Sequence, residues 1–331
     1  MTRRKYWQAI NDALREELGR DERVVLFGED IAEPGGPFGA SNGLLAEFGP
    51  GRVRDTPISE AAITGMAVGS AMAGLRPIVE IMFFDFITLA LDQLVNQAAK
   101  MSYMSMGHYS VPLTLRTLCG AHLGSGPQHS QNLESWVASV PGLKVVWGGT
   151  PADAKGLLKA AVRDPDPVVV IESAGLWSSR AEVPDDTEHV VPIGEASTRR
   201  VGTDVTLICW GSTVPRADRA AATLAEEGIS VEVLDLRTLN PLDVRHILGS
   251  VTKTGRLVVV QDATGPCSVG TEVIRIAATH GFGSLRTAPQ LVSPPFAPTP
   301  FPGRLARAYF PQNDDIVAAV RRAVAKENTV V

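Results

Sequence analysis

The sequence predicts an α/β protein of two domains, each built on a mainly parallel β-sheet covered by helices. Short apolar runs alternate with segments of helical periodicity along most of the chain, and this alternation is typical of parallel sheets. The 331 residues suffice for two domains of about 150 residues each. Between Gly175 and Gly202 the alternation lapses. We therefore expect a first domain over residues 1–190 and a smaller second domain over residues 191–331.

The elements expected in the first domain begin with a helix. Apolar residues recur every three or four positions from Tyr6 to Leu18, and Gly19 ends this stripe. Apolar, β-rich runs and helix-period segments then alternate. These predict strands at residues 24–30, 77–83, 112–118, 144–149 and 167–173, and helices at residues 92–104 and 151–162.

The same alternation restarts after the lapse and defines the second domain. It predicts strands at residues 204–211, 230–236 and 256–262, and helices at residues 214–227, 241–251 and 271–281 and after Asn313. The proline-rich stretch at residues 293–303 has too many prolines for a sheet. We expect it to form a surface loop.

Composition and missing motifs exclude several classes of protein. The chain has 36 acidic and 31 basic residues and a net charge of −5, which argues against a general nucleic-acid binder. Its three cysteines form no CxxC pair, and the N-terminus has no apolar core of a signal peptide. The most apolar stretch, residues 78–91, contains two acids and is too short to span a bilayer. We expect a cytoplasmic protein without a membrane segment.

The most informative segment is the small-residue helix expected to start near Ser59. Ser59 is a plausible N-cap, Glu60 would begin the helix, and Gly65 and Gly69 lie four residues apart on one face. Each glycine inside a helix costs about 1 kcal/mol relative to alanine. Either another backbone approaches this face closely, or the helix is simply buried within its own domain.

The same segment carries a family resemblance. Glu60, Gly65, Met66 and Gly69 match the E-x4-G-Φ-x-x-G pattern of thiamine diphosphate enzymes. Further segments, in order, resemble the beta subunit of the E1 component of 2-oxoacid dehydrogenase complexes. They are GED, DTPISE, GLRPIVE, DQLVNQAAK, YMS, QHSQ, PADAKGLL, DPVVVIE and VLDLRTLNPLD. The resemblance implies a pyrimidine-binding first domain, a transketolase-like second domain, and decarboxylation of a 2-oxoacid with transfer of the acyl group to a lipoyl E2.

The resemblance also implies roles for individual residues. Glu60 would be catalytic by hydrogen bonding to the aminopyrimidine ring of thiamine diphosphate and shifting it to its imino form. Ile58 and Phe86 would line the pyrimidine pocket, with Phe86 stacking on the ring. His129, within QHSQ, would face the substrate and its lipoyl acceptor and supply a proton. We expect the neighbouring Phe83 and Phe84 to be buried strand residues.

The family also has a potassium site, and the resemblance places its ligands in this chain. The carbonyl groups of Leu113, Ala161 and Val162 and the side chains of Asp164 and Asp166 would supply oxygen ligands. An ordinary helix end followed by a proline-containing turn accounts for the same residues equally well.

Part of the expected cofactor site is missing from the sequence. Thiamine diphosphate enzymes usually hold Mg²⁺ and the diphosphate with a GDG motif and a later asparagine, and this chain has no GDG. The resemblance implies that these ligands lie on a separate E1 alpha subunit in an α2β2 heterotetramer. We therefore expect the cofactor to be bound across an interface between subunits.

Two other functions stay open from the sequence. The same α/β pair could act as an acetoin-cleaving or acyloin-forming carboligase, in which the acceptor differs but the cofactor does not. Alternatively, the chain could be a non-catalytic assembly subunit, although the joint presence of Glu60, Phe86 and His129 argues against this. The identity of the 2-oxoacid cannot be read from the sequence, because part of the pocket would belong to the partner.

Overall fold

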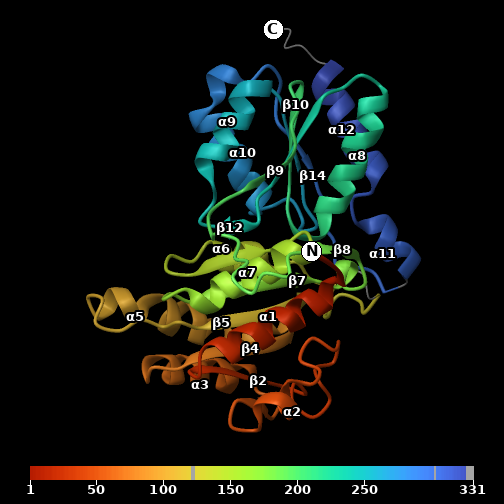
Figure 1. The fold of residues 1–331 in the computed structure, drawn as a ribbon. Coiled ribbons are helices and arrows are strands. Elements are labelled where there is room, and N and C mark those ends of the chain that lie inside the picture. The colour runs from red at the N-terminus through yellow and green to blue at the C-terminus, as the bar shows by residue number, and fades with distance from the viewer. Residues whose placement is uncertain (121–123, 302, 326–331) are drawn as a thin grey trace.

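The computed structural model describes residues 1–120, 124–301 and 303–325, which form two stacked α/β domains (Figure 1). The first domain contains a seven-stranded sheet in the order β12-β6-β7-β5-β4-β2-β3. All neighbouring strands are parallel except β12 and β6. The strands are β2 (Val24–Gly28), β3 (Val53–Asp55), β4 (Arg76–Phe83), β5 (Thr114–Cys119), β6 (Lys144–Trp147), β7 (Val168–Ser173) and β12 (Thr238–Asn240).

Helices cover both faces of this sheet. On one face α1 (Tyr6–Arg20) and α7 (Pro151–Arg163) pack against each other over a core that includes Ile10, Leu14 and Leu157. On the other face lie α3 (Glu60–Met72) and α4 (Ile87–Asp92). Smaller elements complete the domain: α2 (Leu44–Phe48), α6 (Glu134–Ala138), η1 (Phe84–Phe86) and η3 (Ala174–Leu176).

The most apolar stretch of the sequence is divided among several elements. It forms β4, η1 and α4, and the helix predicted at residues 92–104 is interrupted by a π-helical segment, η2 (Gln93–Ala98), before α5 (Ala99–Met104). Within residues 1–120, 124–301 and 303–325, no helix is both long enough and apolar enough to cross a membrane.

The sequence analysis missed a small antiparallel sheet. β1 (Thr2–Lys5) pairs with β8 (Arg180–Val183) and ties the N-terminus to the end of the first domain. Both strands are short and rich in charged residues, so neither shows the apolar run that identifies a buried strand.

The second domain has a five-stranded sheet in the order β14-β13-β10-β11-β9, in which only β9 is antiparallel to its neighbour. Its strands are β9 (Ser197–Arg200), β10 (Val205–Cys209), β11 (Val231–Asp235), β13 (Leu257–Val260) and β14 (Gln290–Val292). In Figure 1 two helices lie on each side of this sheet. They are α8 (Val214–Glu226) with α12 (Asn313–Ala325), and α9 (Val244–Thr254) with α10 (Val269–His280); η4 (Gly211–Thr213), η5 (Phe282–Ser284) and α11 (Gly303–Tyr309) complete the domain.

The chain crosses back once between the domains. After β11 it returns to the first sheet as β12, which pairs with β6, and Asn240 donates a hydrogen bond to the carbonyl of Leu143 at 2.7 Å. The predicted division at residue 190 thus leaves one strand of the first sheet on the far side of the boundary.

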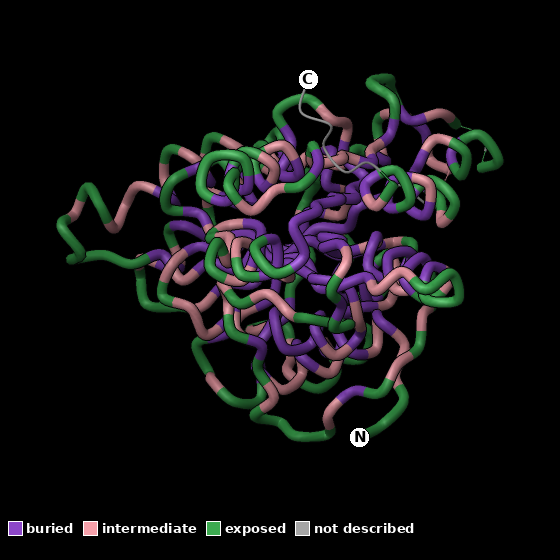
Figure 2. Tube along the Cα trace, turned by 90° about the horizontal axis from the view of Figure 1, so that it is seen from above, coloured by how far each residue is buried: buried purple, intermediate pink, exposed green. Residues whose placement is uncertain are grey.

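The two domains share one apolar core at their junction. A single buried cluster runs from the α3 and α4 face of the first sheet to the α9 and α10 side of the second, and Figure 2 shows buried backbone passing through the centre of the molecule. At the contact, a Cβ on Gly211 would lie 2.3 Å from the ring of Trp147, and the φ of Gly211 is +52°. Glycine is required there both by the close approach and by the backbone conformation.

Three charged side chains are buried within the first sheet. Arg116 on β5 bonds Glu172 on β7 through Nε and Nη2, at 2.8 and 2.9 Å, and Glu80 on β4 through Nη1 at 2.7 Å. Burial lowers the pKa of Arg116, but Glu172 and Glu80 raise it by more. Burial raises the pKa of Glu172 despite Arg116. This triad links three adjacent strands and depends on all of its members.

Removing the cation should therefore be strongly destabilising. For Arg116→Met we expect the free energy of unfolding to fall by about 3–5 kcal/mol, because two carboxylates are left buried without their partner. Urea denaturation of the full-length chain measures this loss. The matched change Arg275→Met, at an exposed pair with Glu272, should lower the free energy of unfolding far less, because water already solvates both charges. Equal losses in the two variants would contradict the assignment.

Two further carboxyl groups are buried near the domain junction. Burial raises the pKa of Glu134 to about 7, with a smaller contribution from Asp262. Burial raises the pKa of Asp235 to about 7 as well, with Asp153 adding to it. In mildly acidic solution both carboxyl groups are therefore mainly neutral in the folded protein.

Stability should consequently fall as the pH rises. A carboxyl group with a higher pKa in the folded chain than in the unfolded chain stabilises the fold. This stabilisation is complete at pH values below the unfolded pKa. It is lost as the pH rises through the folded pKa, which is about 7 for both groups. Between pH 5.5 and pH 8 we expect the double variant Glu134→Gln, Asp235→Asn to lose less stability than the parent chain. Urea denaturation at both pH values tests this, with exposed Glu22→Gln as the control. An identical pH slope in the double variant and the parent would refute the assignment.

Candidate active site

The residues predicted to contact the cofactor or the substrate, and also Glu29, follow the carboxyl ends of adjacent parallel strands. The loop with His129 follows β5, Phe86 follows β4, Glu29 follows β2, and Ile58 and Glu60 follow β3. These four strands are neighbours in the sheet. Strands lie about 4.8 Å apart, so the outermost two of the four are about 14 Å apart. The carboxyl edge of a parallel sheet is where α/β proteins bind ligands.

Glu60 is the first residue of α3 and is partly exposed. Ser59 occupies the N-cap position, as predicted, although its side chain makes no capping hydrogen bond. Burial, Asp30 and Glu60 together raise the pKa of Glu29, so Glu29 and Glu60 are close enough to interact. Ile58, which precedes the helix, is 73% exposed.

Two aromatic rings contact His129, the second predicted catalytic residue. The His129 ring lies edge-to-face with Phe86 and with Phe83, at centroid distances of 5.2 and 5.1 Å. Phe38 in turn contacts Phe83 at 5.8 Å. The structure thus brings Phe86 and His129 together. Phe83 and Phe84 were both predicted to be buried strand residues. Phe84 is buried but lies in η1, whereas Phe83 ends β4 but is half-buried and contacts His129.

Sequence reasoning missed Asp85, which lies between Phe84 and Phe86 and is only 5% exposed. Its Oδ1 atom accepts hydrogen bonds from the backbone N–H and the side-chain amide of Gln131, two residues after His129. The sequence did contain a signal for Asp85, namely an acidic residue inside an apolar run. A carboxylate in such a run is buried only when polar partners satisfy it, so its presence predicts a specific hydrogen-bonding role.

The small-residue helix presents an open face. Ile63, Ala67 and Ala71 are buried against the sheet, whereas Gly69 is exposed and a Cβ on it would meet no atom within 4 Å. At Gly65 the nearest atom would be the flexible side-chain end of Gln93, at 3.3 Å. The described part of this chain therefore does not provide the close backbone approach that was one explanation for the two glycines.

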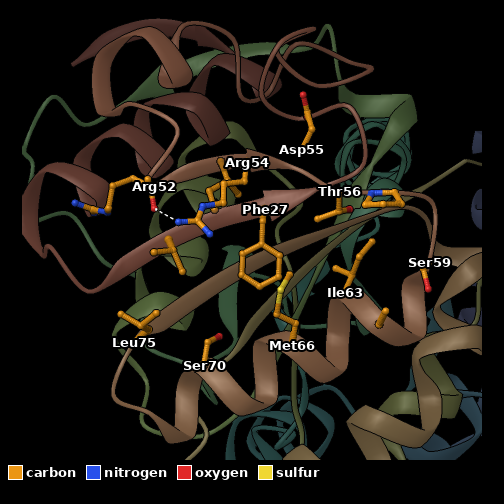
Figure 3. Close-up of a pocket in the computed structure, with 15 residues that line it drawn as sticks. Phe27, Arg52, Arg54, Asp55, Thr56, Ser59, Ile63, Met66, Ser70 and Leu75 are labelled. Atoms are coloured by element: carbon orange, nitrogen blue, oxygen red, sulfur yellow. Dashed lines mark hydrogen bonds between the residues drawn. The ribbon is translucent and has the colours of Figure 1, made fainter.

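An apolar cavity of about 700 Å³ runs beside the same helix, between α3 and strands β2 and β3, of which β3 is the edge strand (Figure 3). Phe27 and Met66 approach each other across it, Ile63 and Leu75 extend the apolar wall, and Arg52 and Arg54 lie on its polar side. Ser59, immediately before Glu60, lies at one end. The cavity and the exposed helix face form a continuous surface next to the predicted catalytic glutamate.

The residues predicted to bind potassium are already engaged by donors within the chain. The carbonyls of Leu113 and Ala161 accept backbone hydrogen bonds from Val168 and Asp164. Arg76 Nη1 donates to the carbonyl of Val162 at 2.7 Å and to that of Asp164 at 3.1 Å.

A second positively charged side chain, that of Lys144, forms ion pairs with the carboxylates of the same loop. Lys144 Nζ lies 2.7 Å from a carboxylate oxygen of Asp164 and 3.0 Å from one of Asp166. Arg76 and Lys144 therefore already contact several of these oxygen atoms. Potassium at this loop stays a prediction.

The residues near Glu60 fit one half of thiamine diphosphate. A partly exposed carboxyl group, an aromatic ring and an exposed aliphatic side chain suit an aminopyrimidine. Asp85 Oδ2 and Thr56 Oγ1 are also buried without a hydrogen-bond partner in the described residues. Among those residues, no group of three or more His, Cys, Asp or Glu is placed to hold a metal ion. The groups near Glu60 thus suit the pyrimidine half of the cofactor.

Comparison with known proteins identifies the family. The sequence model described as "Transketolase, pyrimidine binding domain" matches residues 3–178, and "Transketolase, C-terminal domain" matches residues 194–316. The chain is 44% identical over 326 residues to the beta subunit of acetoin:2,6-dichlorophenolindophenol oxidoreductase of Cupriavidus necator, covering 96% of both chains. The chain belongs to the transketolase-like family of E1 beta subunits. It is also 45% identical to pyruvate dehydrogenase E1 subunit beta-2 of Oryza sativa subsp. japonica, covering 96% of this chain and 85% of that one.

A solved structure agrees with the fold of this E1 beta family member. A split-gene transketolase, described as an inactive beta4 tetramer, superposes with a TM-score of 0.80 over 98% of this chain and 99% of that chain, at 21% identity. This confirms the predicted arrangement of a pyrimidine-binding first domain and a transketolase-like second domain.

Proposed function

We propose that this chain is the beta subunit of a thiamine diphosphate-dependent 2-oxoacid dehydrogenase E1, and that it decarboxylates a pyruvate-like 2-oxoacid and passes the acyl group to a lipoyl-bearing E2. The observation that best supports this proposal is that Glu60, Phe86 and His129 all lie at the carboxyl ends of strands in the same part of the first sheet. Relatives at 43–45% identity include pyruvate dehydrogenase E1 beta subunits from a plant and a bacterium.

Glu60 is proposed to control the protonation of the pyrimidine ring. Bound thiamine diphosphate supplies a carbon nucleophile and an electron sink for 2-oxoacid decarboxylation. The Glu60 carboxyl would share a proton with a pyrimidine nitrogen, and the neighbouring Glu29 adds negative charge that favours the protonated ring. Such positioned proton transfer contributes a factor of about 10² to 10⁴ in rate.

Phe86 and His129 are proposed to act on either side of the reacting centre. Phe86 would stack on the pyrimidine, because a ring offers a large flat contact at little entropic cost. Neither ring nitrogen of His129 is hydrogen bonded to another described residue, and the ring packs on two phenylalanines. The imidazole is thus oriented, with its nitrogens left to donate a proton to a developing alkoxide and to the lipoyl acceptor.

A partner subunit is proposed to complete the site. We propose an E1 alpha subunit that supplies the Mg²⁺ and diphosphate ligands, in an α2β2 heterotetramer. One observation supports this: the open face of α3 beside the apolar cavity leaves Gly69 free for close approach by another chain. We further propose a cytoplasmic location, in keeping with three cysteines that form no disulfide.

A second candidate is favoured by a specific comparison. The beta subunits of two acetoin:2,6-dichlorophenolindophenol oxidoreductases, from Cupriavidus necator and Bacillus subtilis, are each 44% identical to this chain. An acetoin-cleaving or acyloin-forming enzyme would use the same cofactor and the same Glu60. Assay of the chain with its alpha partner, comparing 2-oxoacids with acetoin and a dye acceptor with lipoamide, separates the two functions.

The isolated chain should bind the cofactor poorly. Because it holds only the pyrimidine half of the site, thiamine diphosphate with Mg²⁺ should not raise the melting temperature of the chain alone, but should raise it once the alpha subunit is present. Thermal-shift titration with and without the alpha subunit measures this. Tight, Mg²⁺-dependent binding by the isolated chain would overturn the proposed division of the site.

Loss of the Glu60 carboxylate should remove activity without unfolding the chain. In the complex with the alpha subunit, Glu60→Gln should lower kcat by about 10² to 10⁴, while the urea midpoint of the chain stays unchanged because Glu60 is partly exposed at a helix start. The exposed Glu226→Gln is the control and should keep full activity. Normal turnover by Glu60→Gln would remove this residue from the mechanism.

A further inference from the structure

The loop that carries His129 is clamped to the turn that carries Phe86. Asp85 Oδ1 accepts a hydrogen bond from the Gln131 backbone N–H at 3.2 Å and another from Gln131 Nε2 at 2.9 Å. Asp85 lies in η1 directly before Phe86, and Gln131 lies two residues after His129. One buried carboxylate oxygen therefore spans the two segments whose aromatic rings meet.

The rest of the loop is anchored elsewhere. Ser130 Oγ donates to the carbonyl of Gly120 at 3.4 Å. Asn132 Nδ2 donates to the carbonyl of Asp262 in the second domain at 2.9 Å, and Asn132 Oδ1 accepts from Cys119. These contacts hold the loop after β5 in place without Asp85. The Asp85 clamp is the one that fixes the loop relative to Phe86.

His129 itself has no polar anchor of this kind. Its ring contacts are the edge-to-face packing on Phe83 and Phe86, and in the described part of the chain no hydrogen bond reaches either ring nitrogen. Its backbone approaches β5 so closely that a Cβ on Gly120 would lie 2.0 Å from the His129 carbonyl oxygen. The position of the imidazole therefore depends on where the backbone on either side of it is held.

We propose that Asp85 is a positioning residue for His129, which it holds beside Phe86 through Gln131. Charge-assisted hydrogen bonds of this type are stronger than neutral ones, and here a single carboxylate makes two. The Oδ2 atom of Asp85 is buried without a partner in the described residues. An incompletely satisfied buried carboxylate is costly, which is consistent with a role beyond stability. That Asp85 positions the His129 ring does not depend on the proposed function. Only the effect of Asp85 on turnover rests on the proposed function.

The structural part can be tested by NMR of imidazole-labelled full-length chain, with His129→Asn assigning the His129 signal. In Asp85→Ala the His129 signal should shift and broaden, because the ring is no longer held against Phe86. Asp85→Asn keeps an oxygen acceptor for Gln131 and should restore the parent spectrum. The matched control is Asp92→Ala, an exposed acid seven residues further on, which should leave the signal unchanged.

The catalytic part uses the complex with the alpha subunit. Misplacing a reacting group by about 1 Å can lower rates by about 10²-fold, so Asp85→Ala should lower kcat by about 10- to 100-fold. The KM for the 2-oxoacid should stay within about threefold, since Asp85 is not proposed to contact substrate. Asp85→Asn should recover most of the loss.

The outcomes separate the two proposals. If the parent complex decarboxylates no 2-oxoacid but the His129 signal responds to Asp85→Ala, the proposed function fails and the positioning role stands. A folded Asp85→Ala chain with an unaltered His129 signal overturns the positioning role. If Asp85→Ala does not fold, Gln131→Ala replaces it, because Gln131 is exposed and its truncation removes the 2.9 Å bond. An unchanged His129 signal in that variant overturns the proposal equally.

Discussion

The buried triad of Arg116, Glu80 and Glu172 is the constraint on which the geometry of the site depends. One guanidinium satisfies two carboxylates on neighbouring strands, so β4, β5 and β7 cannot shift in register without leaving a charge unpaired in the core. Phe86 follows β4 and the His129 loop follows β5. The same pairing that fixes the centre of the sheet therefore fixes where these two loops begin.

The second domain contributes to the site by supporting that loop. Trp147 packs under Gly211, β12 completes the first sheet, and Asn132 reaches the carbonyl of Asp262. A continuous apolar core joins the domains, which makes the junction dry enough to keep Glu134 and Asp235 neutral in mildly acidic solution. The His129 loop is thus held from both domains, although every predicted cofactor contact lies in the first.

The other side of the site is open. Glu60 begins a helix whose buried face packs on the sheet and whose open face carries Gly69, beside an apolar cavity. Glycine at position 69 costs about 1 kcal/mol in a helix interior and uses no space within the described chain, so this face suits close contact with another subunit. This arrangement agrees with the proposal that a partner subunit completes the cofactor site.

The sequence by itself determined the fold class, the family and most buried strands, because apolar periodicity and the motif around Glu60 are local signals. It did not reveal β1, β8 or β12, which are short strands without an apolar run and form only through distant pairing. The tertiary structure alone decided that Phe83 and Phe86 meet His129, that Asp85 holds Gln131, and that Arg76 and Lys144 occupy the loop predicted to bind potassium. Each of these joins residues far apart in sequence, and such contacts follow from strand order and loop placement rather than from local spacing.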